Sequence, residues 1–172
     1  MIEEIQLLES TIFKEKNLKI SMIEPDAECE EYFGYNFQLN QHKIKFRKAK
    51  ITPKKIGQFV TLWKRNRNVE TEPFQENDDF DFYIIFTNQK EKSGFFIFPK
   101  SILAENNILS TNSKIGKRGF RLYSEWDFPE NKQAEKTKNW QTDFFVDLMK
   151  NKNVYFEKFE NIWSNFIKIN QP

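Results

Sequence analysis

The sequence has no acidic residue between Glu31 and Glu70, although a stretch of that length would hold five or six at the average density of the chain. A coding bias that enriches lysine enriches glutamate equally, so it does not explain this gap. Ten basic residues occupy the stretch, and a chain of net charge +2 therefore combines a segment of +10 with a remainder of −8. Such a segment favours a polyanion such as nucleic acid as its neighbour, with a solvated basic face as the alternative. The ten residues are Lys43, Lys45, Arg47, Lys48, Lys50, Lys54, Lys55, Lys64, Arg65 and Arg67.

Cysteine and histidine each occur once, which excludes several kinds of site. Cys29 has no partner for an internal disulfide, and a lone cysteine fits a reducing compartment. Cys29 and His42 are too few soft ligands for a tetrahedral zinc site. A catalytic triad would also depend on His42, which we predict to be an exposed turn residue. The five glycines are scattered and form no phosphate-binding or dinucleotide-binding pattern.

Long apolar runs are absent as well. No segment approaches the roughly 20 apolar residues that span a bilayer, and the N-terminus lacks the pattern of a signal peptide. We therefore predict a cytoplasmic protein that does not associate with a membrane. The length and the 19 phenylalanines suit one domain with an aromatic core. Its expected parts are an N-terminal helix with an acidic linker at 1–31, a core at 32–149 and a C-terminal helix at 150–172.

Hydrophobic periodicity predicts the secondary structure. Residues 2–17 carry apolar residues at helical spacing, and residues 35–39 and 43–47 alternate around a polar turn, which predicts a hairpin with one cationic side. The other predicted elements are a short helix from Thr52 and Pro53 to Gly57, strands at 59–63, 80–86, 94–98 and 120–123, a polar loop at 66–78, and helices at 102–107, 132–149 (capped by Asn131) and 155–167. This order predicts an α/β (α+β) fold with a mixed central sheet flanked by helices.

A second basic region follows the predicted central strands. Gly116 and Gly119 flank Lys117 and Arg118, and glycine lets the backbone approach an anion closely. This pattern predicts a phosphate contact. A flexible loop with solubilising charges is the alternative.

Further candidates for contact with a nucleic acid lie on the predicted helix 132–149 and at two tryptophans. Lys132, Lys136 and Asn139 share one helical face because they are spaced by four and three residues. Trp63 and Trp126 are candidates for stacking on bases, with burial in the core as the alternative for both.

Several ordered sequence blocks resemble the MepB family of bacterial proteins, over roughly residues 32–146. The blocks are Lys50–Phe59, Gly94–Lys100, Ile108–Ser110 followed by Lys114–Gly119, and Asn131–Thr137. The resemblance implies a restriction-endonuclease-like α/β fold and nucleic-acid binding. The family name reflects proximity to a multidrug efflux gene, which is an association and not an activity.

A nuclease of that fold class needs two acids and a lysine on adjacent strands, because Mg²⁺ requires oxygen ligands and the attacking water a nearby cation. Asp79 and Asp81 begin one central strand, and Lys100 follows the next. Phe98 stands where the second acid is expected, and a phenyl ring cannot bind magnesium. Ordinary surface roles for Asp79, Asp81 and Lys100 are the alternative. Other acids open to the missing role are Glu76, Asp78 and Glu135.

These observations lead to one hypothesis and two alternatives. We predict binding of DNA or RNA through sequence-tolerant phosphate contacts, at a degenerate nuclease-like site that does not hydrolyse its ligand and needs no metal or cofactor. The alternatives are a Mg²⁺-dependent nuclease and a protein-interaction module in a drug-response pathway that uses the acidic N-terminal helix. The bases expected to converge on one groove around Asp81 and Lys100 are Lys54, Lys55, Lys64, Arg65, Lys117, Arg118 and Lys136.

Overall fold

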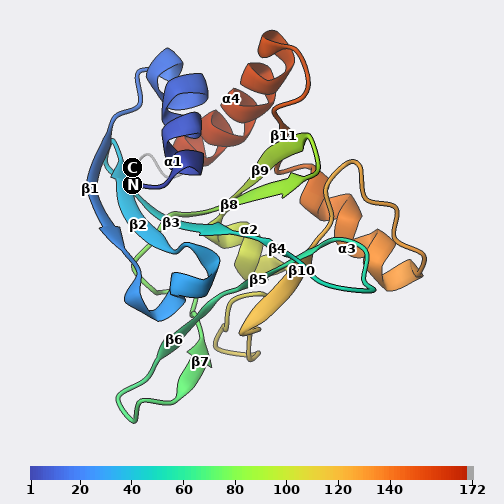
Figure 1. Ribbon diagram of the computed structural model, residues 1–172. Helices are drawn as coiled ribbons and strands as arrows, with labels where there is room; N and C mark the ends of the chain where they lie inside the picture. The colour runs from blue at the N-terminus through green and yellow to red at the C-terminus, as the bar shows by residue number, and fades with distance from the viewer. Residues whose placement is uncertain (170–172) are drawn as a thin grey trace.

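A six-stranded mixed sheet organises the fold, in the order β1-β2-β3-β8-β9-β11 (Figure 1). The computed structural model describes residues 1–169, so positions 170–172 of the predicted C-terminal segment lie outside it. Neighbouring strands are antiparallel except β3 and β8, which are parallel, with Ile44 opposite Phe82. The strands are β1 (Ile20–Pro25), β2 (Tyr35–Leu39), β3 (His42–Lys48), β8 (Phe82–Gln89), β9 (Lys92–Pro99) and β11 (Phe145–Asp147).

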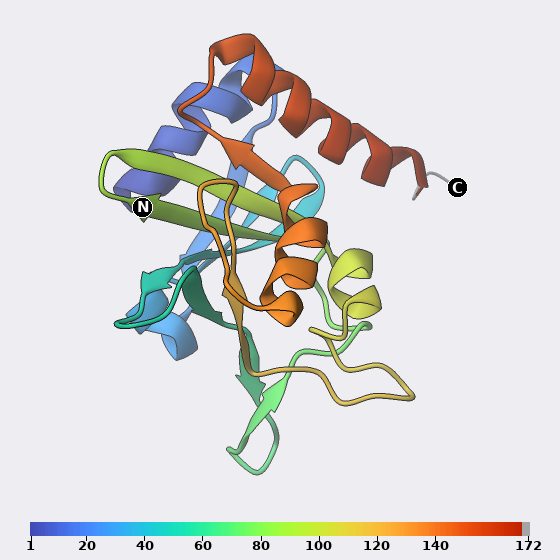
Figure 2. The ribbon, with the colours of Figure 1, turned by 90° about the vertical axis from the view of Figure 1, so that its right-hand side faces the viewer.

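A three-stranded sheet and two helices cover one face of the central sheet, and a two-stranded hairpin extends from the same side. The sheet β10-β5-β4 lies under the central strands, and the hairpin β6–β7 projects from the body (Figures 1 and 2). The strands of these sheets are β4 (Lys50–Ile51), β5 (Gln58–Thr61), β6 (Trp63–Arg65), β7 (Thr71–Pro73) and β10 (Gly119–Leu122). The helices on this side are α2 (Lys100–Glu105) and α3 (Lys132–Thr142), together with the short 3-10 segment η3 (Ala27–Tyr32).

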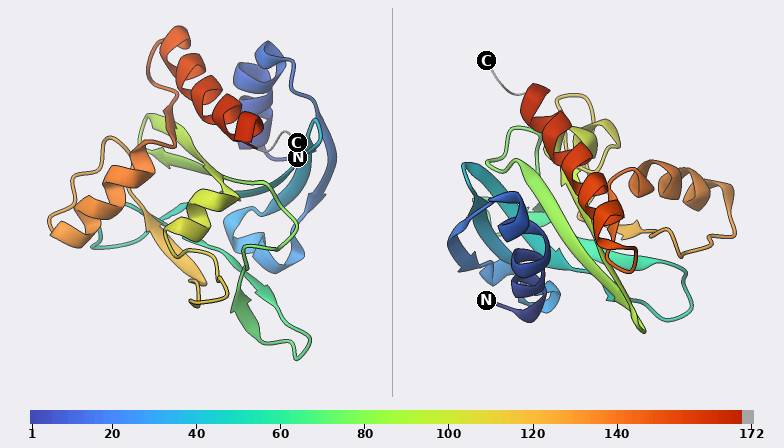
Figure 3. Two further views of the ribbon diagram at one scale, coloured as in Figure 1. Left: turned by 180° about the vertical axis from the view of Figure 1, so that it is seen from behind. Right: turned by 90° about the horizontal axis from the view of Figure 1, so that it is seen from above.

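Helices from the two ends of the chain cover the opposite face. One is a continuous helical stretch made of α1 (Glu3–Leu8), the π turn η1 (Glu9–Phe13) and the 3-10 turn η2 (Lys14–Lys16). The other is α4 (Lys152–Ile169), which lies on the same side of the sheet (Figure 3). Both contribute buried side chains to one core, including Phe13 and Phe159.

The central strands β8 and β9 join the two cores into one domain. Residues 82–87 and 94–99 are all buried, because both faces of these strands are covered. On β8, Phe82 faces the core beneath the terminal helices, and Tyr83 faces the core shared with β5 and β10. The prediction of a single α/β domain with a mixed central sheet flanked by helices is confirmed.

Several predicted elements differ in the structure. The helix predicted at 132–149 ends at Thr142, because Phe145 pairs with Phe96 in the central sheet. The predicted helix from Thr52 to Gly57 is instead the six-residue loop between β4 and β5. The polar loop at 66–78 contains β7, and β1 was not predicted at all. The helical cap at Asn131 is confirmed, since its Oδ1 accepts a hydrogen bond of 2.9 Å from the N–H of Ala134.

Gly57 packs the β4–β5 loop against β10. We expect Gly57→Ala to lower the free energy of unfolding by about 1–3 kcal/mol. Its φ is +79°, and a Cβ at this position would lie 2.4 Å from the carbonyl oxygen of Leu122. Urea unfolding would measure the loss. Lys55→Ala, in the same loop, is the control and should unfold at the same urea concentration as the wild type. An unchanged midpoint for Gly57→Ala would mean that this loop relaxes without cost.

Candidate nucleic-acid interface

Acidic residues from outside the acid-free segment neutralise most of its charge. Asp26, Glu28 and Glu31 come from the segment before β2, Glu4 from α1, and Asp78 and Asp79 from the segment before β8. Among the described residues, Lys54, Lys55 and Arg67 are the members of the ten that form no ion pair. The ion pairs are Lys43–Asp79, Lys45–Asp26, Arg47–Asp26, Lys48–Glu4, Lys50–Glu31, Lys64–Asp78, Lys64–Glu72 and Arg65–Glu28.

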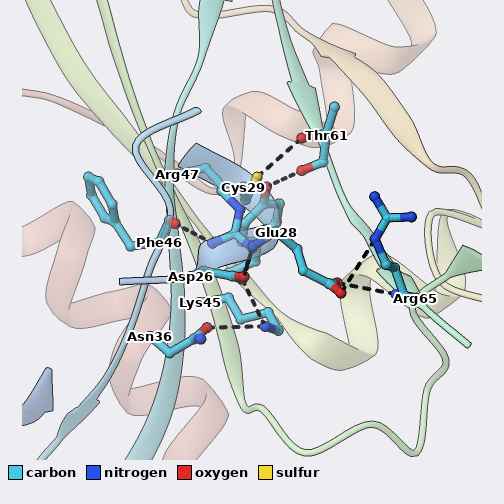
Figure 4. A network of polar contacts seen from close by, with 10 residues as sticks. Asp26, Glu28, Cys29, Asn36, Lys45, Phe46, Arg47, Thr61 and Arg65 are labelled. Carbon is cyan, nitrogen blue, oxygen red and sulfur yellow. Dashed lines mark hydrogen bonds and ion pairs between the residues drawn. The ribbon is translucent and has the colours of Figure 1, made fainter. Parts of the chain in front are cut away.

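The largest of these clusters is buried between η3 and the central sheet (Figure 4). The guanidinium of Arg47, which is 1% exposed, donates to a carboxylate oxygen of Asp26 and, over 2.7 Å, to the carbonyl oxygen of Phe46. Lys45 Nζ donates to Asn36 Oδ1 at 3.1 Å and lies 3.7 Å from Asp26. These bonds fasten the start of η3 to β3.

Burial and the neighbouring charges shift the pKa values of this cluster. Burial raises the pKa of the Asp26 carboxyl, but the charges of Arg47 and Lys45 and the Arg47 hydrogen bond lower it by more. The net pKa of Asp26 therefore lies below its ordinary value. Burial, and then the charge of Arg47, lower the pKa of Lys45, and Asp26 only partly offsets them. Asp26 is thus mainly the counter-ion of Arg47, and the cluster holds the fold together.

The structure places Lys100 beside Asp81, since the backbone N–H of Lys100 donates to the carbonyl oxygen of Asp81 at 2.9 Å, but the side chains of the predicted catalytic residues have other partners. Asp79 forms an ion pair with Lys43, and a carboxylate oxygen of Asp81 accepts the backbone N–H of Lys43 at 2.8 Å. Lys100 Nζ donates instead to the carbonyl oxygen of Asp78 at 2.9 Å. Both carboxylates therefore contact Lys43 at the start of β3, and the Lys100 ammonium contacts a backbone carbonyl.

The carboxylates near Lys100 have other partners. Within residues 1–169, no group of three or more histidine, cysteine, aspartate or glutamate side chains is placed to hold a metal ion. Asp78, the acid beside Lys100, accepts hydrogen bonds from Lys64 Nζ and the N–H of Gln75. Phe98 is fully buried.

His42 was predicted to be an exposed turn residue, and this prediction is wrong. It begins β3, and its imidazole ring packs edge-on against Phe82 and Trp163. The ring nitrogen Nδ1 lies 3.8 Å from a carboxylate oxygen of Asp81.

The predicted phosphate-binding residues are distributed over several places. Lys64 and Arg65 are held in the ion pairs described above, and Arg118 donates to the carbonyl oxygen of Thr71 at 2.7 Å. Lys117 and Lys136 line one cavity of about 520 Å³, and Lys54 and Lys55 line another of about 500 Å³. Within the described residues, these side chains therefore do not all meet in one groove around Asp81 and Lys100.

The cavity of Lys117 and Lys136 lies between α3, β10 and the end of α2, and we call it the α3 groove. It also contains Arg121, which sequence reasoning did not select because the alternating strand pattern hid its role. In the part of the chain that is described, Lys117 and Lys136 are exposed and form no ion pair. The groove is also lined by Asn106, Asn107, Asn131, Gln133, Trp140 and a single acid, Glu105.

Arg121 also connects the α3 groove to the cavity of Lys54 and Lys55. Its guanidinium Nη1 donates to the carbonyl oxygens of Ile56 and Gly57, at 3.3 and 3.1 Å. Ile56 and Gly57 line the second cavity, so this arginine forms part of the wall between the two. The cations of both cavities therefore border one region of the surface.

The glycines of the basic loop serve packing and not anion binding. The N–H of Gly116 donates to Ser110 Oγ and the N–H of Lys117 to the carbonyl oxygen of Ile108, both at 2.9 Å. A Cβ on Gly116 would lie 2.5 Å from the carbonyl oxygen of Ile108. The glycine lets the loop close on residues 108–110, and this contact fixes the position of Lys117 in the α3 groove.

The fold and this basic surface define a mixed α/β domain with a groove lined by uncompensated bases. Residues 26–147 match the sequence model of the MepB-like family. The chain belongs to the MepB-like family. A crystal structure of MepB is 30% identical, covers 88% of this chain and 100% of its own, and superposes with a TM-score of 0.77.

More distant comparisons add little to the assignment. A bacterial homing endonuclease is 13% identical, with a TM-score of 0.46, covering 93% of this chain and 88% of its own. No match was found among curated proteins. Within residues 1–169, no helix is long and apolar enough to cross a membrane.

Proposed function

We propose that this protein binds DNA or RNA through sequence-tolerant phosphate contacts. The observation that carries the proposal is the α3 groove, where Lys117, Arg121 and Lys136 meet and Glu105 is the one lining acid. Cations that face a shared groove attract a phosphate chain, and side-chain amides hydrogen-bond to sugars and bases. The asparagines and Gln133 of the groove supply such amides. A nucleic-acid ligand also agrees with the cytoplasmic location expected from the lone cysteine.

The proposal includes no hydrolysis and no metal or cofactor. Asp79 and Asp81 are turned toward Lys43, and Lys100 is bonded to the backbone of Asp78. In a restriction-endonuclease-like fold, as the family resemblance implies, this arrangement corresponds to a catalytic site that has lost its function. The α1 helix is not favoured as a docking element for another protein, because Ile5 and Leu8 bury its inner face and Glu4 pairs with Lys48.

Salt dependence tests the proposal. Fluorescence anisotropy with labelled oligonucleotides would measure the association constant at several salt concentrations. A plot of its logarithm against the logarithm of the salt concentration should have a slope of about −2 to −3, the value for three neutralised phosphates. The double variant Lys117→Ala/Lys136→Ala should reduce the magnitude of this slope by about 1–2 units, because each lysine accounts for one phosphate.

Matched lysines on the other side of the protein serve as controls. Lys14 and Lys19 are exposed and lie in or just after the N-terminal helical stretch. Lys14→Ala/Lys19→Ala removes the same charge and should leave affinity and slope as in the wild type. A wild-type slope near zero, or equal losses in both double variants, would refute the proposed interface. Plasmid incubated with Mg²⁺ or Mn²⁺ should stay intact with wild-type protein and with Lys100→Ala alike.

A further inference from the structure

The second cavity differs in character from the α3 groove. It has a volume of about 500 Å³, within the usual range for small-molecule sites, and lies between the β4–β5 loop and residues 126–130. Lys54 and Lys55 stand on the loop side and are exposed, without ion pairs among the described residues. The remaining lining residues are Ile51, Ile56, Gly57, Gln58, Gln89, Trp126, Asp127, Phe128 and Glu130.

Two of the lining residues carry buried polar atoms without a partner in the described part of the chain. Gln58 is 3% exposed, and its Nε2 donates to the carbonyl oxygen of Asn88 at 2.9 Å, which fixes the orientation of the amide. Its Oε1, an acceptor, has no hydrogen bond. Trp126 Nε1, a donor, has none either. Because buried polar atoms are nearly always paired with protein groups or with water, this acceptor and this donor are available to a water molecule or to a ligand.

Aromatic and cationic groups complete the cavity. Phe128 is 76% exposed, an unusual state for phenylalanine, and Lys138 Nζ lies 5.0 Å from the centre of its ring. The Asp127 carboxylate is occupied by the N–H of Ser124, at 2.7 Å. The exposed acid Glu130 also lines the cavity, and Lys54 and Lys55 lie on its loop side. A ligand that matches the cavity therefore needs an aromatic face, one donor, one acceptor and a negative charge beside the two lysines.

We propose that this cavity receives one unpaired nucleobase of a bound strand, with the adjoining phosphates at Lys54 and Lys55. Every nucleobase combines an aromatic face with donors and acceptors along the edge that pairs in a duplex. Gln58 and Trp126 would engage that edge, and Phe128 would stack on the base. The pairing edge is free only in a single strand, so the protein prefers single-stranded to duplex nucleic acid. This inference rests on the proposed function and adds the class of ligand.

Matched oligonucleotides test the preference. At one salt concentration, a single strand should bind about tenfold more tightly than a duplex of equal length, the effect expected for one stacked base. Phe128→Ala should abolish most of this difference by weakening single-strand binding about tenfold, with duplex binding unchanged. Phe33→Ala, at another exposed phenylalanine, should change neither.

A mononucleotide separates this inference from the proposed function. The indole N–H resonance of Trp126, assigned with Trp126→Phe, should shift on titration with adenosine 5′-monophosphate and stay in place with inorganic phosphate. Equal binding of single strand and duplex, unaffected by Phe128→Ala, would overturn the base pocket and leave the proposed function standing. If neither polymer binds, the proposed function fails. In that case the mononucleotide titration alone tests the base pocket. An indole resonance that does not shift with adenosine 5′-monophosphate would overturn the base pocket.

Discussion

Replacing Asp26 with alanine is expected to lower the free energy of unfolding by about 3–5 kcal/mol, the cost of leaving one charge of a buried pair without its partner. Arg47 is 1% exposed, and the Asp26 carboxylate is its single acidic partner within the described residues. Lys45 adds to the effect because its ammonium lies 3.7 Å from the same carboxylate. The buried charge of Arg47 and the partly buried charge of Lys45, which lie two residues apart on one face of β3, would then have no acidic partner among the described residues.

Urea unfolding followed by circular dichroism would measure this loss. Glu30→Ala is the matched control, because Glu30 is an exposed acid of the same η3 segment and forms no ion pair in the described structure. Glu30→Ala should change the free energy of unfolding by less than about 0.5 kcal/mol. The double variant Asp26→Ala/Arg47→Met should recover part of the loss, since an apolar side chain of similar length removes the orphaned charge. Equal midpoints for Asp26→Ala and Glu30→Ala would show that the buried pair contributes no stability.

The effect of Asp26 should depend on pH with a definite sign. Its folded pKa is lowered below the unfolded value of about 3.9, so its stabilising contribution is complete above that pH. The contribution disappears as the pH falls through the lower folded pKa. The difference in stability between wild type and Asp26→Ala should therefore narrow below about pH 4.

Local sequence patterns predicted most of the fold, because they act within one element. Alternation at 35–47 predicted the β2–β3 hairpin, and the apolar runs predicted β8 and β9. Pairing between strands that are far apart in the sequence has no local sequence pattern that would predict it. Phe145 continues the helical apolar pattern of α3, and only its pairing with Phe96 assigns it to a strand. Nothing in the residues 20–25 alone predicts β1, whose side chains are mostly exposed at a sheet edge.

The site was harder to predict because charge balance in space does not follow charge order along the chain. The acid-free segment suggested a large uncompensated surface, yet acids before β2 and before β8 fold back onto it. Lys117 was selected because it follows Gly116, and Lys136 because it shares a helical face with Lys132 and Asn139. The structure places both lysines in one groove. Arg121 lines the same groove, but no sequence pattern indicated this, because a single arginine in a strand is common.

Replacing Phe98 with glutamate, the type of residue that a nuclease would need there, is expected to destroy the fold and to yield no cleavage. Phe98 is fully buried and its ring lies 5.4 Å from that of Phe96, 5.4 Å from Trp140 and 5.9 Å from Phe144, measured between ring centres. Loss of such a ring costs about 3–5 kcal/mol, and burial of a carboxylate adds to that cost. Phe98→Glu should therefore lose at least about 5 kcal/mol, which is as much as many domains possess.

Phe98→Leu is the matched control, because it keeps an apolar side chain and should cost less than about 1.5 kcal/mol. Circular dichroism and urea unfolding would compare the two variants, and plasmid nicking with Mg²⁺ would test for activity. A folded Phe98→Glu protein that cleaves DNA would mean that the position is still part of a catalytic site. We expect the opposite, because Phe98 supports Trp140, and Trp140 lines the α3 groove. Phe98, which stands where the sequence analysis expected a second acid, thus supports the wall of the proposed binding surface.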